Sequence, residues 1–150
     1  MNQEFVVIYI INSKTQQVLY LRKNHGPKRL IGKLVEFGGL IEPIDKTDNE
    51  IGTIINAAKR ELKEELHDVE KEIKKDFFQD ESKYNYFKKI NIPNGILHIL
   101  KIEINEVLPQ MIIPTEGNLE YQSIHYHNLN PKEFPENDIE MLNGLFEIKN

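Results

Sequence analysis

Apolar residues at three- and four-residue spacing, in the segment after Asp48, constrain the fold of this chain more than any other feature. They are Ile51, Ile54, Ile55, Ala58, Leu62 and Leu66. This period is typical of a helix that packs one face against a core. Asp48 has a side chain suited to capping the first turn, and we expect the helix to end near His67 and Asp68.

The expected helix lies between two groups of strand patterns. β-Branched and aromatic residues bounded by turn residues predict strands at 4–11, 17–22, 84–90, 95–105 and 119–127. A last helix is predicted at 136–147. Strands that alternate with two helices predict one α/β domain over residues 1–150, with a central mixed sheet between two helical layers, an α/β/α sandwich.

Composition and charge exclude several classes of protein. The chain has 150 residues and no cysteine, which excludes disulfides, thiol catalysis and cysteine-built zinc sites. Its net charge of -5 disfavours a stable nucleic-acid partner, but a nucleotide substrate stays compatible because a bound divalent cation reverses the charge locally. No apolar run reaches the roughly 20 residues that span a bilayer, and the run at 5–11 lacks the flanks of a signal peptide. We therefore expect a cytoplasmic protein without a membrane partner.

Three carboxylates cluster on the expected helix. Glu61, Glu64 and Glu65 are three and four residues apart, which places them on one helical face. Like charges this close repel unless a cation neutralises them, and a dense set of hard oxygen ligands suits Mg²⁺ or Mn²⁺. The alternative is the solvated face of a Glu- and Lys-rich helix, which is common.

The residues around these carboxylates resemble the box of the Nudix family, G-x5-E-x7-R-E-U-x-E-E-x-G-U, in which U is aliphatic. Gly39 matches the opening glycine, and residues 60–65, Arg-Glu-Leu-Lys-Glu-Glu, match the R-E-U-x-E-E core in full. Residues 18–23 and the approach through Phe37 and Gly38 also resemble MutT-like members of the family. Beyond Asp68 the resemblance is one of general pattern.

The chain departs from this box at several positions. Gly39 and Arg60 are separated by 21 positions where the family has 14, and we place the insertion of about seven residues within 43–50. Counted back from Arg60, the first box glutamate falls at Gly52. His67 and Asp68 stand where the box has a glycine and an aliphatic residue.

The resemblance implies a role for each residue that matches the box. Glu64, Glu65 and the backbone carbonyl of Gly38 would bind Mg²⁺ or Mn²⁺. Glu61 would be a further metal ligand or the base that orients the attacking water. Gly39 would lie beside the substrate.

Arg60 would brace the glycine loop, which in the family it does by pairing with the first box glutamate. Because Gly52 has no carboxylate, we expect Glu42 or Glu50 to fold back and pair with Arg60. A poorly exposed guanidinium needs acceptors. The alternative is that Arg60 caps backbone carbonyls of the loop.

Several residues outside the box are further candidates. The cations Arg22, Lys23, Lys28, Arg29 and Lys33 are candidates to meet substrate phosphates, with Arg22 the best placed, and the alternative is that they are solvated surface charges. Glu116 lies in a loop where many family members carry another catalytic glutamate, although an exposed loop acid is an equal alternative. Asn137 and Asp138 match the place where MutT-like members contact the base, and they are also suited to capping the last helix.

The activity that the resemblance implies is metal-dependent hydrolysis of a nucleoside-linked pyrophosphate. Metal and carboxylates neutralise the phosphate oxygens and align a water. We expect a nucleoside triphosphate pyrophosphohydrolase of MutT type. ADP-ribose and other nucleoside diphosphate sugars are an alternative substrate class, and an RNA 5′-end is a third. An alternative of another class is a non-catalytic nucleotide-binding module.

Overall fold

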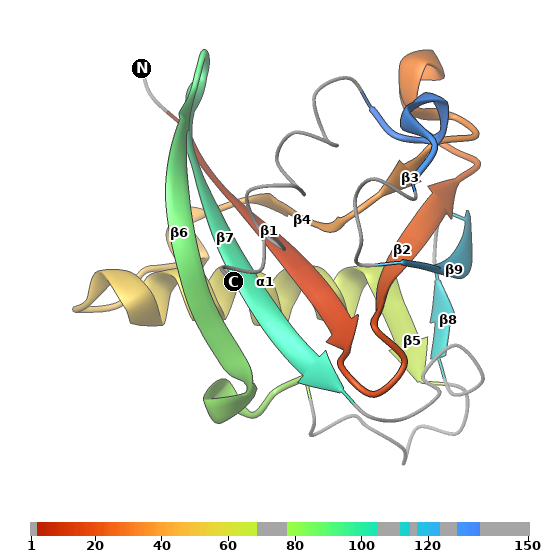
Figure 1. The fold of residues 1–150 in the computed structure, drawn as a ribbon. Helices are drawn as coiled ribbons and strands as arrows, with labels where there is room; N and C mark the ends of the chain where they lie inside the picture. The colour runs from red at the N-terminus through yellow and green to blue at the C-terminus, as the bar shows by residue number, and fades with distance from the viewer. Residues whose placement is uncertain (1–2, 69–77, 105–111, 115–116, 124–128, 136–150) are drawn as a thin grey trace, which may run out of the picture.

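The structure is a computed structural model, which describes residues 3–68, 78–104, 112–114, 117–123 and 129–135. Strand β1 (Gln3–Asn12) is at the centre of a mixed sheet (Figure 1). On one side it pairs in parallel with β7 (Gly95–Ile104) along its whole length. On the other side it has two antiparallel partners in turn, β4 (Phe37–Leu40) and then β2 (Gln17–Lys23). The sheet therefore divides beside β1, at the point where β4 ends and β2 begins.

The remaining strands extend this sheet or form a small second one. Strand β6 (Tyr84–Ile92) pairs with β7, while β3 (Leu34–Val35) and β9 (Gly117–Ser123) pair with β2. The predicted strands at 4–11, 17–22, 84–90 and 95–105 are confirmed to within two residues. The strand expected at 119–127 begins two residues earlier, at Gly117, and residues 124–127 lie outside the described residues.

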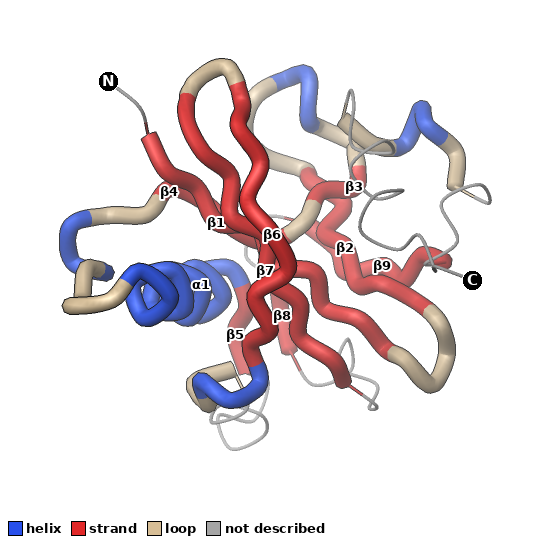
Figure 2. Tube along the Cα trace, turned by 60° about the vertical axis from the view of Figure 1, so that its left-hand side comes forward, coloured by secondary structure: helices blue, strands red, loops and turns tan. Residues whose placement is uncertain are grey.

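Helix α1 (Glu50–Glu65) covers one face of the sheet (Figure 2). It buries Ile54, Ala57, Ala58 and Leu62 in a core shared with β1 and β4. Ile51 was expected in this apolar stripe but is 45% exposed. The reason is that the first turn of α1 projects beyond the strands that cover the rest of the helix (Figure 1).

Both ends of α1 differ from the prediction. The amide of Gly52 donates to Oδ1 of Asn49 at 2.5 Å, so Asn49 caps the first turn and the assignment of this role to Asp48 was wrong. The helix ends at Glu65 rather than near His67 and Asp68, because residues 66–68 form β5 (Leu66–Asp68) and pair with β8 (Ile112–Pro114).

The opposite face of the sheet carries a second core. It contains Tyr9, Tyr20, Leu34 and Ile99, and Phe134 packs its ring edge-on against Tyr20 with 5.2 Å between ring centroids. Phe134 follows the short 3-10 helix η6 (Pro131–Glu133). The mixed sheet of the predicted α/β fold is thus confirmed, and the helix predicted at 136–147 lies outside the described residues. No helix in the described part of the chain is long and apolar enough to cross a lipid bilayer.

Two isoleucines of α1 that differ in burial allow a controlled test of which face of the helix is buried. Ile54 is 1% exposed and Ile51 is 45% exposed on the same helix. Ile54→Ala should lower the free energy of unfolding by about 2 to 4 kcal/mol, because it leaves a cavity in the core. Ile51→Ala should lower it by less than about 1 kcal/mol. Urea denaturation measures both, and equal losses would contradict the assignment of the buried face.

Candidate active site

Arg60 joins helix α1 to the turn that follows β4. Its Nε and Nη2 donate to Oδ1 and Oδ2 of Asp45, each at 2.9 Å, and Nη2 also donates to the carbonyl oxygen of Leu40 at 2.9 Å. The Asp45 side chain is 3% exposed and that of Arg60 is 18% exposed. Two parallel hydrogen bonds between a planar guanidinium and a carboxylate fix the orientation of both groups.

Asp45 is itself held by a short 3-10 helix, η2 (Pro43–Asp45). The amide of Glu42 donates to Oδ2 of Asp45 at 2.8 Å, and the amide of Asp45 donates to the carbonyl of Glu42 at 2.9 Å. The side-chain amide of Asn56 donates to the Asp45 carbonyl at 3.2 Å. Pro43 begins the turn with a fixed φ and needs no donor there. The Asp45 carboxylate is therefore directed toward Arg60 before any ligand binds.

The pair between Asp45 and Arg60 is ionic at neutral pH. Burial opposes the charged form of Asp45, but hydrogen bonds from Arg60 and from the Glu42 backbone outweigh it and lower the pKa of the carboxyl. Hydrogen bonding to Asp45 in turn raises the pKa of Arg60.

Three further carboxylates meet at the Nη1 atom of Arg60. Oε2 of Glu42 lies 2.8 Å from it, Oε1 of Glu61 lies 3.1 Å from it and Oε1 of Glu64 lies 3.4 Å from it. The Glu61 side chain is 12% exposed, whereas that of Glu64 is 59% exposed. One fixed cation thus offsets part of the repulsion among these carboxylates.

The two glycines inside β4 allow the helix and the sheet to approach closely. Gly38 has a φ of +150°, and a Cβ there would lie 2.1 Å from the carbonyl oxygen of Val6. A Cβ on Gly39 would lie 2.5 Å from Oε1 of Glu61. The Glu61 carboxylate therefore packs directly on the backbone of the glycine turn. The amide of Gly38 also points to Oε1 of Glu65, at a long 3.5 Å.

Burial raises the pKa of Glu61, and the negative charges of Glu64 and Glu42 add to this effect while Arg60 opposes it. Glu65 contacts the glycine turn from the last turn of α1.

Arg22 lies in a different cluster, at the end of β2. It donates to both carboxylate oxygens of Glu120, to Oε1 of Glu133 at 3.0 Å and to the carbonyl of Gly32 at 2.8 Å. These contacts tie β2 to β9 and η6. Within the described part of the chain, no hydrogen bond or ion pair joins Arg22 to the carboxylates of α1. Its role in binding substrate stays a prediction.

The other candidates outside the box are placed as follows. Lys23 ends β2, and its backbone closes the following loop through hydrogen bonds with Gly32 and Lys33. Glu116, Asn137 and Asp138 lie outside the described residues. Their predicted roles stay predictions.

Neither family models nor curated proteins match this sequence. Solved structures do match its fold. A Nudix hydrolase from Alicyclobacillus acidocaldarius has a TM-score of 0.68 at 13% identity, covering 99% of this chain and 92% of that one. MutT, studied from Aliivibrio salmonicida and Vibrio cholerae, has a TM-score of 0.57 at 16% identity, covering 97% and 99%.

A bifunctional NMN adenylyltransferase/ADP ribose pyrophosphatase from Francisella tularensis, complexed with AMP and a Mn ion, has a TM-score of 0.64 at 17% identity. The match covers 98% of this chain and 42% of that protein, so this chain spans less than half of its length. The chain has the Nudix fold. At these identities the likeness establishes the fold and not the activity.

The Nudix box can now be aligned on this chain from its contacts. The first acid of the box is the sixth residue after the opening glycine, and the sixth residue after Gly39 is Asp45. Asp45 is also the residue that pairs with Arg60. This pairing makes Asp45, in place of Gly52, a candidate for the first acid of the box. The extra residues would then lie between Asp45 and Arg60, where they include the turn that caps α1 through Asn49.

The hypothesis about the partners of Arg60 is confirmed for Glu42 and not for Glu50. Glu42 makes an ion pair at 2.8 Å, whereas the described residues give Glu50 no ion pair with Arg60. The alternative is also present in part, because Arg60 caps the carbonyl of Leu40. The main partner, Asp45, was missed. Counting forward from Gly39, instead of back from Arg60, would have found it.

The residues around Arg60 fit a hard divalent cation by their donor chemistry. Oxygens of Glu42, Glu61 and Glu64 lie within 3.4 Å of one nitrogen of Arg60, whose other terminal nitrogen donates to the carbonyl of Leu40. Carboxylate and carbonyl oxygens are the ligands that Mg²⁺ and Mn²⁺ prefer. In the part of the chain that the structure describes, no three acidic or histidine side chains form a preformed metal site. The Nudix carboxylates would therefore turn from Arg60 to hold a metal.

Asp45→Asn should lower the free energy of unfolding by about 2 to 3 kcal/mol, because it leaves a poorly exposed guanidinium without its buried counter-ion. Glu42→Gln, at a side chain that is 49% exposed, should cost less than about 1 kcal/mol. The pKa of Asp45 is lower in the folded state, so its contribution is present above a pH of about 4 and is lost as the pH falls through the folded pKa. Denaturation of both variants between pH 3 and 7 measures this. A deficit of Asp45→Asn that persists unchanged at the lowest pH would contradict the assignment.

The two glycines of β4 should respond differently to alanine. Gly38→Ala should destabilise by about 3 kcal/mol or more, because its Cβ meets the backbone of Val6 and its φ is unfavourable for alanine. Gly39→Ala meets only the end of the Glu61 side chain, which can turn away, and should cost about 1 kcal/mol. Thermal denaturation measures the two losses of stability. A larger loss for Gly39→Ala than for Gly38→Ala would contradict the close approach of Gly38 to the Val6 backbone.

Proposed function

We propose that this protein is a Mg²⁺- or Mn²⁺-dependent hydrolase that cuts the pyrophosphate of a nucleoside-linked substrate. The observation that carries the proposal is the cluster of carboxylates that meet at Arg60, beside the glycine turn of a Nudix fold. Carboxylates this close together, two from α1 and two from the η2 turn, are costly unless they bind cations. Arg60 supplies one positive charge, and the exposed Glu64 leaves the cluster open toward solvent.

In this proposal Glu64 and Glu65, with the carbonyl of Gly38, hold the metal. The metal supplies charge neutralisation on the non-bridging phosphate oxygens. Glu61 is a further ligand or the base that orients the attacking water, and its contact with Gly39 places its carboxylate against the glycine turn. Arg60 is a positioning residue, because it holds Glu61 and is itself held by Asp45.

For the substrate we propose a nucleoside triphosphate, cut as a MutT-type enzyme cuts it. The match with the MutT structure covers 97% of this chain and 99% of that one, so the two chains share the fold along nearly all of both sequences. ADP-ribose is the second candidate. It is favoured by the likeness to the Francisella tularensis protein, an ADP ribose pyrophosphatase in one of its two functions. A structure of an ADP compounds hydrolase is also similar, with a TM-score of 0.58 at 19% identity.

Glu64→Gln and Glu65→Gln should each lower turnover by about 100-fold or more, because losing a charged metal ligand removes several kcal/mol of transition-state stabilisation. Release of phosphate or pyrophosphate from nucleoside triphosphates and ADP-ribose, with Mg²⁺ or Mn²⁺, measures this. EDTA should abolish the activity. Lys63→Gln, on the same exposed turn of α1, is the control and should keep the wild-type rate.

Two outcomes would contradict the proposal. Equal rates for the wild type and both glutamine variants, with and without EDTA, would exclude a hydrolase centred on this helix. Tight binding of a nucleotide with no turnover of any substrate would favour the non-catalytic module instead.

A further inference from the structure

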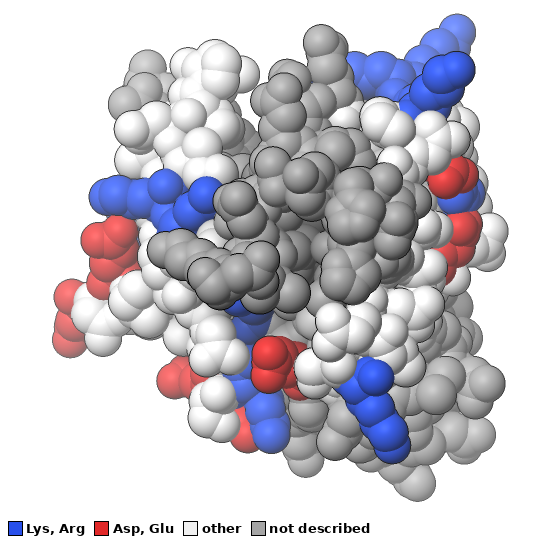
Figure 3. All heavy atoms as spheres, viewed as in Figure 1, with Lys and Arg blue, Asp and Glu red and all other residues white. Residues whose placement is uncertain are grey.

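A cluster of cations lies in the loop between β2 and β3, away from the carboxylates around Arg60. Residues 23–33 contain Lys23, Lys28, Arg29 and Lys33 and no acidic residue, in a chain whose net charge is -5. The short 3-10 helix η1 (Lys28–Leu30) lies in this loop. Figure 3 shows Lys and Arg side chains gathered at the corner of the molecule where η1 is drawn in Figure 1. A local excess of positive charge on an acidic protein is a feature of anion binding.

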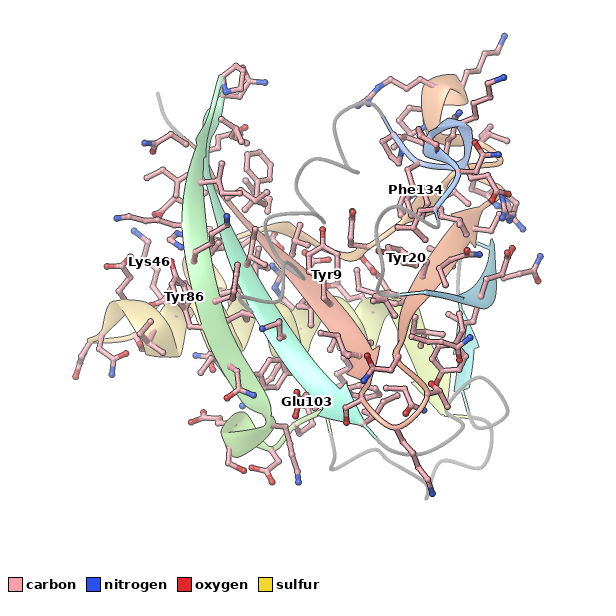
Figure 4. All side chains as sticks on the ribbon, viewed as in Figure 1. Tyr9, Tyr20, Lys46, Tyr86, Glu103 and Phe134 are labelled. Carbon is pink, nitrogen blue, oxygen red and sulfur yellow. The ribbon has the colours of Figure 1, made fainter. Side chains whose placement is uncertain are left out.

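This loop borders a pocket of about 400 Å³. Arg29 and Lys33 line it as the charged residues, and Leu30, Phe134 and Pro135 supply apolar surface. Phe134 is buried against Tyr20, which gives the pocket a rigid wall (Figure 4). Among the described residues that line the pocket, none is acidic. A few polar groups on a mostly apolar wall is the usual make-up of a small-molecule site.

Arg29 differs from the other two arginines of the chain. Arg22 and Arg60 are each held by two or more carboxylates. No hydrogen bond or ion pair joins the Arg29 guanidinium to any residue that the structure describes. Lys33 points its ammonium to the carbonyl of Lys132 on η6, which fixes it at the pocket. A permanently charged guanidinium with its donors uncommitted, next to a fixed ammonium, suits a phosphate oxygen cluster.

The pocket lies within reach of the candidate active site. Lys33 is five residues before Gly38, and the chain between them forms β3 and the start of β4. At about 3.4 Å per residue, the two Cα atoms are at most roughly 17 Å apart. A distance of this size is within the length of a nucleotide, and the Phe134 wall of the pocket belongs to the core on the face of the sheet opposite α1.

We propose that Arg29 and Lys33 form a second anion subsite, which binds a phosphate group of the substrate other than the pyrophosphate that is cut. The link to catalysis rests on the proposed function, whereas the binding itself does not. The second phosphate is carried either on the ribose 3′ oxygen, as a monoester or the start of a chain, or at the end of a longer 5′ polyphosphate. Both sources present the same oxygen cluster to the two cations.

Calorimetry without divalent metal tests the binding. The probes are AMP, adenosine 3′,5′-bisphosphate and adenosine 5′-tetraphosphate. At least one of the two larger probes should bind the wild type tenfold or more tightly than AMP. Arg29→Gln and Lys33→Gln should each remove most of that preference, because each removes one charged contact. Lys89→Gln removes the same charge from an exposed position on β6 and should keep the preference.

Kinetics then separates this subsite from the catalytic centre. For whichever larger substrate the binding test prefers, adenosine 5′-triphosphate 3′-phosphate or adenosine 5′-tetraphosphate, Arg29→Gln should raise KM about tenfold and leave kcat nearly unchanged, while the KM for ATP should stay as in the wild type. Equal affinity of the wild type for all three binding probes would overturn the inference, and so would a preference that survives both substitutions. If the wild type prefers a larger probe to AMP but hydrolyses no substrate, the proposed function is overturned and the anion subsite is still supported.

Discussion

The ion pair between Arg60 and Asp45 is the contact on which the rest of the candidate site depends. Desolvating a guanidinium and a carboxylate that is 3% exposed costs free energy, and only close pairing with satisfied hydrogen bonds compensates for it. The Leu40 carbonyl accepts from the same guanidinium, so one side chain connects α1, β4 and η2. With Arg60 fixed in this way, its remaining nitrogen can hold Glu61 and Glu64 close together.

The sheet supplies the backbone against which these side chains are placed. Strand β1 keeps one parallel partner along its length but changes its antiparallel partner from β4 to β2. Gly38 and Gly39 of β4 pair with β1 and also contact the carboxylates of α1. At Gly38 the backbone lies too close to Val6 for any side chain, and at Gly39 it lies too close to Glu61. The same short path leads back through β3 to the cationic loop, so the two regions proposed to bind phosphate belong to one continuous segment.

Local patterns were sufficient for most of the fold. The strands and α1 follow from residue periods that are set by which face is buried. The period cannot show where the covering strands stop, which is why Ile51 was placed in the core. It also cannot show β5, whose partner β8 is distant in the sequence. Asp45 was missed as a partner of Arg60 because the box was counted back from Arg60 and not forward from Gly39. The partners of Arg22 are 98 and 111 residues away, and only tertiary structure reveals them.

The most direct test of this account is a double-mutant cycle between Asp45 and Arg60, followed by chemical denaturation. The variants are Asp45→Asn, Arg60→Met and the double variant. If Asp45 acts through Arg60, each single change leaves a charged group without its partner, and the second change then costs little. The loss in the double variant should fall short of the sum of the single losses by about 1 kcal/mol or more. Losses that add within error would contradict the central role of this ion pair.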